Sequence, residues 1–177
     1  MAEETKSKME NKPQNVMRTV KIDKVVLSVG GIGEELEKGF KLLKLVTNKN
    51  PTKTKSKKRI PSLGVRPGLE IGAVVTLRKG MEDFLKRMLL AIDNQLKKKQ
   101  VSVNNFSFGI KEYIEIPGLE YQRDIGIKGF DVTIVFKRTG RRVGLRKIKR
   151  GKVPSRQHIP KEEIIKFMEE NFKVEFK

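Results

Sequence analysis

The stretch Glu70–Lys97, EIGAVVTLRKGMEDFLKRMLLAIDNQLK, decides the fold class because the spacing of its apolar residues changes partway along. Over residues 70–79 apolar side chains occupy every second position, Ile71, Ala73, Val75 and Leu77, which predicts a strand with one buried face. From Met81 to Lys97 apolar residues recur three and four positions apart, which predicts an amphipathic helix. A half-buried strand followed directly by a core-facing helix is typical of an α+β domain.

The same patterns recur on both sides of this stretch. Further strands are predicted at residues 20–29, 52–54, 105–110, 112–116, 130–136 and 173–176, and further helices at 34–46 and 161–171. Asn48 suits the left-handed cap at the end of the helix over 34–46. Most strands are half polar, so we expect an antiparallel or mixed sheet with helices packed on one face. A long basic loop should project from it.

Length and composition suit one domain with a short tail. The chain has 177 residues, of which 37% are hydrophobic, enough for one core. We expect residues 1–14 to form a flexible tail and residues 15–177 to form a single RNA-binding domain. Residues 1–14 have no apolar centre that would indicate a signal peptide. No apolar run is long enough to span a bilayer, so no membrane partner is expected.

Two basic runs without carboxylates are the strongest functional signal. Lys49–Pro67 holds seven Lys or Arg, and Lys137–Lys152 holds nine in sixteen positions. Such runs are often only solvated surface, but here the whole chain carries a formal charge of +19. That charge indicates a polyanionic partner, and nucleic acid is favoured over an anionic membrane. Binding should then weaken steeply with salt because counterions are released.

The composition of the first basic run favours RNA. Thr52, Thr54 and Ser56 alternate with lysines, so hydroxyls can bond to phosphate and to the ribose 2′-OH while the lysines supply charge. No zinc finger, leucine zipper or helix-turn-helix pattern indicates a DNA regulator. The absence of cysteine and the single histidine, His158, exclude disulfides, thiolate catalysis and a Cys/His metal site.

Motifs that would indicate an enzyme are incomplete. Gly31-Ile32-Gly33 lies between a strand and a helix, but Leu36 stands where a dinucleotide fingerprint needs its third glycine. The carboxylate pairs Glu162/Glu163 and Glu169/Glu170 fall on an exposed helix face and do not suggest an acid–base pair. Around Phe130 the chain is faintly similar to an RNA-recognition motif strand, although a core role fits its apolar residues better. We expect no catalysis and no cofactor.

Several segments, in order, resemble one family. They are NVMR (15–18), KVVLSV (24–29), NPTKTKSKK (50–58), GVRPGLEIGAVVTLR (64–78), DFLKRMLLAIDNQL (83–96), NFSFGIKEYIEIPGLEY (105–121), IGIKGFDVTIVF (125–136) and KVPSRQH (152–158). The chain is similar to the L-five family of large-subunit ribosomal proteins that bind 5S ribosomal RNA, in its archaeal and eukaryotic form. The resemblance covers residues 15–177.

The resemblance implies a structural constituent of the large ribosomal subunit, in the central protuberance of cytoplasmic ribosomes. It implies as partners 5S rRNA, 23S-type rRNA, P-site tRNA, a neighbouring 5S rRNA-binding ribosomal protein, and a small-subunit head protein at an intersubunit bridge. The implied 5S rRNA contacts are Asn15, Met17, Arg18, Lys24, Ser28, Thr52 and Thr54. The implied tRNA contacts are Lys55, Ser56, Lys57, Lys58 and Arg59.

Two of the chain's departures from the family pattern lie near expected RNA contacts. Ser28 stands where the family has Asn, and Thr47-Asn48-Lys49 replaces Thr-Gly-Gln before the proline loop. Asn48 can keep the left-handed cap, whereas Ser28 changes one polar contact to RNA. An alternative function from another class is a free RNA-binding module or RNA chaperone that acts outside the ribosome.

Overall fold

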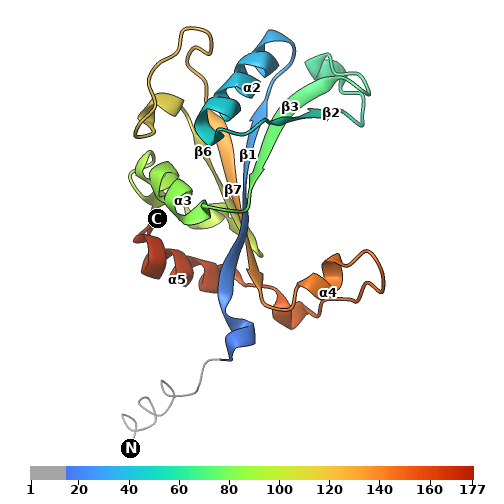
Figure 1. Cartoon of the computed structure of the whole chain (residues 1–177), viewed down its shortest axis with the longest axis vertical. Helices are drawn as coiled ribbons and strands as arrows, with labels where there is room; N and C mark the ends of the chain where they lie inside the picture. Colours follow the sequence, from blue (N-terminus) through green and yellow to red (C-terminus); the bar gives the residue numbers. More distant parts are fainter. Residues whose placement is uncertain (1–14) are drawn as a thin grey trace, which may run out of the picture.

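A six-stranded sheet organises residues 15–177, the part of the chain that this computed structural model describes (Figure 1). The predicted flexible tail, residues 1–14, lies outside the described residues. The strand order is β2-β3-β1-β7-β6-β5, and every neighbouring pair is antiparallel. The strands are β1 (Val20–Gly30), β2 (Thr52–Lys55), β3 (Glu70–Leu77), β5 (Val101–Ser102), β6 (Asn105–Ile110) and β7 (Phe130–Arg138). The sheet is thus antiparallel, one of the two arrangements expected.

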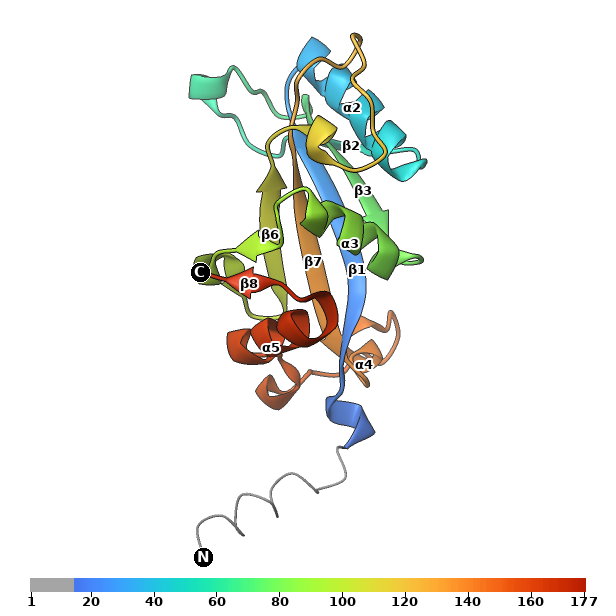
Figure 2. The same ribbon diagram turned by 90° about the vertical axis from the view of Figure 1, so that its left-hand side faces the viewer.

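Three helices cover one face of this sheet (Figure 2). They are α2 (Glu34–Thr47), α3 (Met81–Leu90) and α5 (Lys161–Phe172). A fourth, α4 (Arg142–Leu145), stands apart from them in a segment after β7 (Figure 1). The expected α+β class, with helices packed on one face, is confirmed.

The core lies between the three helices and the sheet, as the alternation in β1 and β7 predicts. Val25, Leu27 and Val29 of β1 are buried, and so is every second residue of β7 from Phe130. Phe136 is fully buried. The centroid of its ring lies 5.9 Å from the ring centroid of Phe106 in β6 and 5.6 Å from that of Phe167 in α5. This aromatic cluster joins the sheet to the last helix.

The predicted helix over residues 81–97 is too long at its C-terminal end. Helix α3 stops at Leu90, and Asp93 and Asn94 have positive φ values of 54° and 57°. These residue types tolerate the left-handed region, so the chain turns there. It then continues as β4 (Gln95–Leu96), which pairs in parallel with β8 (Glu175–Phe176). Leu96 is buried as part of strand β4, although its spacing from the earlier apolar residues also fits a helix.

The strand predicted at residues 112–116 is also wrong. The segment contains a 3₁₀ turn, Tyr113–Glu115, instead. Tyr113 is buried, and its hydroxyl accepts a hydrogen bond from the backbone N–H of Gln122 at 2.7 Å. A long loop therefore folds around one aromatic side chain where alternation alone indicated a strand. The other predicted strands and helices exist.

Two local features at the edge of the sheet matter for the site. Asn48 caps α2 in the left-handed conformation with φ 52°, as predicted. The chain then enters β2, the edge strand, whose pairing with β3 shifts register between Thr54 and Lys55.

Across residues 15–177, no helix has both the length and the apolar character that crossing a membrane requires.

Candidate RNA-binding surface

The face of the sheet opposite α2, α3 and α5 has no covering helix within residues 15–177 (Figures 1 and 2). Successive side chains of a strand point to opposite faces. Val25 and Leu27 are buried under the helices, so Lys24, Val26 and Ser28 lie on the opposite face. Strand register brings the matching side chains of β3 and β7 beside them. We call this surface the open face; it includes Lys24, Val26, Ser28, Val74, Thr76, Asp131, Thr133 and Val135.

A β-bulge adds positive charge to the open face. The pairing of β1 with β7 shifts between Ile22 and Lys24, so Lys21 pairs with Lys137 while Lys24 pairs with Val135. A bulge changes which side chains share a face. Lys21, Lys24 and Lys137 therefore lie on one side, although strict alternation would separate Lys21 from Lys24. Asp23 partly offsets them through an ion pair with Lys137 at 2.7 Å.

The predicted contacts Met17 and Arg18 lie at one end of β1, in a 3₁₀ turn, Val16–Arg18, which Asn15 directly precedes. The Asn15 side-chain oxygen accepts a hydrogen bond from the Met17 backbone N–H at 3.0 Å, which caps the turn. The Thr139 hydroxyl donates to the Val16 carbonyl at 3.1 Å and ties the turn to the segment after β7. Met17 and Arg18 are exposed.

The edge strand β2 presents its threonines and lysines to opposite sides. Thr52 pairs with Val74 and Thr54 with Gly72, which places both on the open face. The Thr54 hydroxyl donates to the Gly72 carbonyl at 3.1 Å. Lys53 turns toward the helices instead.

Lys53 forms ion pairs on the helix side with Glu37 of α2 and, at 3.3 Å, with Glu70 of β3. Its hydrogen bond to Glu37, followed by that to Glu70, raises the pKa of the Lys53 ammonium group above its usual value. The alternating Thr/Lys pattern is thus divided between two faces, and Lys53 is occupied by protein carboxylates.

The basic loop after β2 is a closed hairpin rather than a loose excursion. Ser56 donates its N–H to the Leu69 carbonyl at 2.8 Å and accepts from the Gly68 N–H at 2.9 Å, which closes the base. Ile60 and Val65 form a bridge nearer the tip. The loop projects beyond the ends of β2 and β3, beside the start of α2 (Figure 1), and the two line a hollow together.

The predicted tRNA contacts in this loop differ in accessibility. Lys55, Lys57, Lys58 and Arg59 are exposed. Ser56 is buried, and its hydroxyl donates to the Lys58 carbonyl at 2.6 Å. Ser56 therefore shapes the loop, and its hydroxyl is occupied inside the protein.

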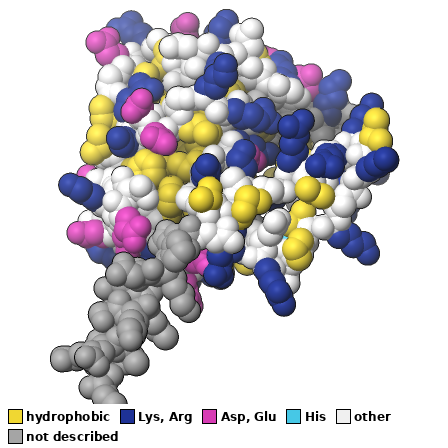
Figure 3. Space-filling model, turned by 60° about the horizontal axis from the view of Figure 1, so that its bottom comes forward, with side chains coloured by type: hydrophobic (Ala, Val, Ile, Leu, Met, Phe, Trp, Pro, Cys, Tyr) yellow, Lys and Arg dark blue, Asp and Glu magenta, His cyan; other side chains and the backbone are white. Residues whose placement is uncertain are grey.

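The second basic run folds into an arm, which we define as residues 139–153. It contains α4, which sequence reasoning missed, and it closes through a hydrogen bond from Gly151 N–H to the Val143 carbonyl at 3.2 Å. Lys and Arg side chains crowd the side of the molecule where this arm lies (Figure 3). The arm and the basic loop project on the same side of the sheet (Figure 1).

Arg138 is the one residue of the second basic run that the fold removes from the surface. It is only 6% exposed because it continues the buried alternation of β7 after Phe136. Its guanidinium pairs with Glu163 of α5 and donates to the Arg156 carbonyl at 2.9 Å. Counting Arg138 as available to nucleic acid is therefore wrong.

Comparison with known proteins gives two family matches that together span most of the chain. Residues 15–66 match the family described as Ribosomal protein L5, and residues 70–167 match the family that describes the C-terminus of the same ribosomal proteins. The chain is 44% identical over 172 residues to Large ribosomal subunit protein uL5 of Sulfolobus acidocaldarius, covering 95% of this chain and 97% of that protein. Its identity to the protein of the same name from Nanoarchaeum equitans is 42% over 166 residues, covering 92% and 98%.

Proposed function

Because the chain belongs to the ribosomal protein L5 family, we propose that its open face and the turn Val16–Arg18 bind 5S ribosomal RNA. Membership makes it a structural constituent of the large ribosomal subunit, on ribosomes in the cytoplasm, and not an enzyme.

One observation carries the 5S RNA proposal. Residues implied by the resemblance come from three separated segments, 15–18, 24–28 and 52–54, and the fold aligns them. Lys24 and Ser28 share a strand face, Thr52 and Thr54 lie on that face two strands away, and the turn Val16–Arg18 continues β1. The surface offers hydroxyls and ammonium groups, which suit the backbone and the 2′-OH groups of a folded RNA.

Filter binding of the full chain tests this proposal. We expect preference for 5S RNA over a random RNA of equal length, because a folded RNA matches the fixed spacing of these groups. For six to ten phosphate contacts, affinity should fall by roughly a thousandfold or more between about 50 and about 200 mM salt. Equal binding to both RNAs would refute the assignment.

The tip of the basic loop is proposed to contact tRNA in the peptidyl site. Lys57, Lys58 and Arg59 are exposed, and the hydrogen bonds of Ser56 close the base of the hairpin that carries them beyond the end of β2. The tip can therefore meet a second RNA while the sheet holds the first. Lys55, at the end of β2, lies between the two surfaces.

Replacing Lys55, Lys57, Lys58 and Arg59 with alanine should separate these roles. We expect 5S RNA affinity to change little and the contact with P-site tRNA on assembled subunits to be lost, as read by chemical footprinting of the tRNA. A control that replaces Lys38, Lys41, Lys44 and Lys86 removes the same charge from helices of the covered face. If the loop variant lost 5S RNA binding and the control variant did not, the loop tip would belong to the 5S RNA surface and the proposed division between the two RNAs would be wrong.

The remaining partners are proposed for two other surfaces. The arm, with basic side chains and no carboxylate, suits 23S-type rRNA. The loop over residues 112–127 differs, since it carries four carboxylates and exposed Tyr121 and Ile127. Acidic groups repel RNA, and exposed aromatic side chains favour protein contacts. We assign this loop to a protein partner, namely the small-subunit head protein or the neighbouring 5S rRNA-binding ribosomal protein.

A further inference from the structure

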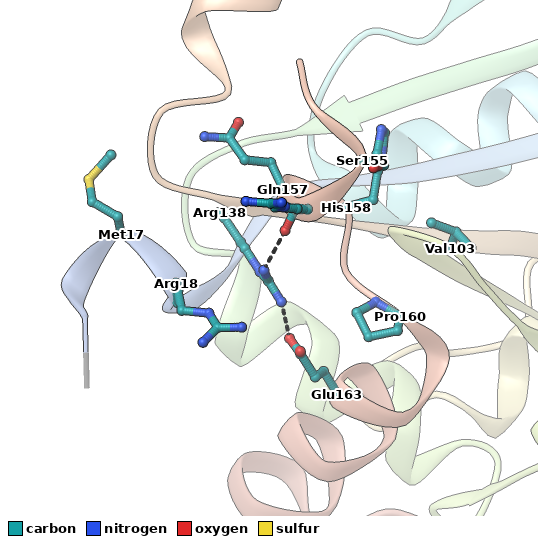
Figure 4. Close-up of a pocket in the computed structure, with 10 residues that line it drawn as sticks. Met17, Arg18, Val103, Arg138, Ser155, Gln157, His158, Pro160 and Glu163 are labelled. Carbon is teal, nitrogen blue, oxygen red and sulfur yellow. Dashed lines mark hydrogen bonds and ion pairs between the residues drawn. The ribbon is translucent and has the colours of Figure 1, made fainter. Parts of the chain in front are cut away.

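A hollow of about 700 Å³ lies where the turn Val16–Arg18, the end of β7, the 3₁₀ turn Ser155–Gln157 and the start of α5 meet (Figure 4). Its size falls within the range of pockets that hold small molecules, roughly 300–1,000 Å³. Arg138 lines it from the helix side of the sheet, so the hollow is separate from the open face. Sequence patterns alone do not indicate it.

The hollow has more positive than negative charge. The buried guanidinium of Arg138 holds Glu163 and the Arg156 carbonyl, and its Nε finds no hydrogen-bond partner among residues 15–177. The guanidinium of Arg18 points toward the same pair (Figure 4) and has no ion-pair partner in the described part of the chain. Arg18 and Arg138 therefore bring two guanidinium groups to one carboxylate, and Arg156 also lines the hollow. An anionic group beside Arg18 would balance them.

Apolar side chains line the hollow beside this charged corner. Met17 is 53% exposed and Val103 is 54% exposed, and Pro160 lies between Val103 and Glu163 (Figure 4). The ring of His158 also lines the hollow. A backbone phosphate alone needs no apolar wall, whereas an unpaired base is held by stacking and apolar contact. The combination fits a phosphate together with its base.

Hydrogen bonds from separate segments hold the walls in place. The Asn104 side chain contacts His158 Nδ1 at 2.7 Å and accepts from the Ile159 N–H at 2.8 Å. The bond from Thr139 to Val16 fixes the turn that carries Arg18. A hollow whose backbone walls are fixed binds without first ordering its loops, which lowers the cost of binding.

We propose that this hollow holds one unstacked nucleotide of the bound RNA, with its phosphate at Arg18 and its base against Val103 and Pro160. The inference rests on the proposed function, since it takes the chain to bind RNA. It adds a site for a single base, off the open face, so RNA with an unpaired nucleotide at the right distance is preferred over a continuous duplex.

Titration of the isotope-labelled full chain with adenosine 5′-monophosphate, ribose 5-phosphate and inorganic phosphate tests the site by NMR. We expect shifts at the backbone amides of Arg18, Val103 and His158, with the monophosphate binding about tenfold more tightly than ribose 5-phosphate because of its base. Equal affinity for all three would indicate an adventitious ion only and overturn the proposal. Absence of shifts at these amides would overturn it as well.

The variant Arg18→Ala should weaken monophosphate binding about tenfold, because it removes the phosphate partner. Arg78→Ala removes the same charge from an exposed position outside the hollow and should leave binding unchanged. An equal effect of the two variants would mean that only general charge attracts the nucleotide. Both side chains are exposed, so neither change should disturb folding.

Binding of 5S RNA by the unaltered chain is measured in parallel. If 5S RNA binds and the monophosphate gives no shifts in the hollow, the nucleotide site is refuted while the proposed function stands. If the monophosphate binds in the hollow and 5S RNA is not preferred over random RNA, the proposed function is refuted instead.

Discussion

Replacement of Lys21 and Lys24 with glutamate is expected to lower the affinity for 5S RNA by about a hundredfold at about 0.15 M salt. The bulge in β1 places both lysines on the open face, where each can neutralise a phosphate. Reversal removes two attractive charges and adds two repulsive ones. The slope of log affinity against log salt should also become shallower by roughly two, since fewer counterions are released. Filter binding over a salt series measures both quantities.

The matched control replaces Lys41 of α2 and Lys86 of α3 with glutamate. Both lysines are exposed on the helices that cover the other face, and the change in net charge is the same. We expect only a small loss of affinity from this variant. If the two variants weakened 5S RNA binding equally, the open face would not be the binding surface.

Phe136→Ala is expected to lower the free energy of unfolding by about 3–5 kcal/mol. Phe136 is fully buried and contacts the rings of Phe106 and Phe167, so its removal leaves a cavity between the sheet and α5. Small domains have only about 5–15 kcal/mol of stability, so this single change should bring the chain close to unfolding at physiological temperature. Urea denaturation followed by circular dichroism measures the loss.

Val135→Ala, one residue earlier on β7, is the control. Val135 is half-buried on the open face, and no helix within residues 15–177 packs over it. Its truncation should cost about 1 kcal/mol or less. A comparable loss from both variants would mean that the core is not confined to the helix side of the sheet.

Alternation and helical spacing predicted the elements that bury one side. The buried faces of β1 and β7 follow from the spacing of their apolar residues. Helix α2 begins at Glu34 and is capped by Asn48, as predicted. The end of α3 could not be predicted from apolar spacing, because the position of Leu96 fits a continued helix and a new strand equally well. Two left-handed residues, Asp93 and Asn94, decided between them.

The candidate site was predictable where it depends on local spacing. Ser28, Thr52 and Thr54 share the open face, as alternation requires once the register is known. Lys21 joins them only through a bulge, which no simple pattern reveals. Lys53, Ser56 and Arg138 depend on partners far away in sequence, namely Glu37, Leu69 and Glu163, so their engagement required the three-dimensional structure.

The edge strand β2 also bears on how a free copy of the chain behaves before an RNA takes it up. An exposed strand edge is a template on which another chain can add and aggregate. Here the edge is short, carries Lys53 and Lys55, and loses register with β3 after Thr54. Each of these features opposes strand addition. The edge that lies beside the proposed RNA-binding surface therefore also protects the newly synthesised protein against self-association.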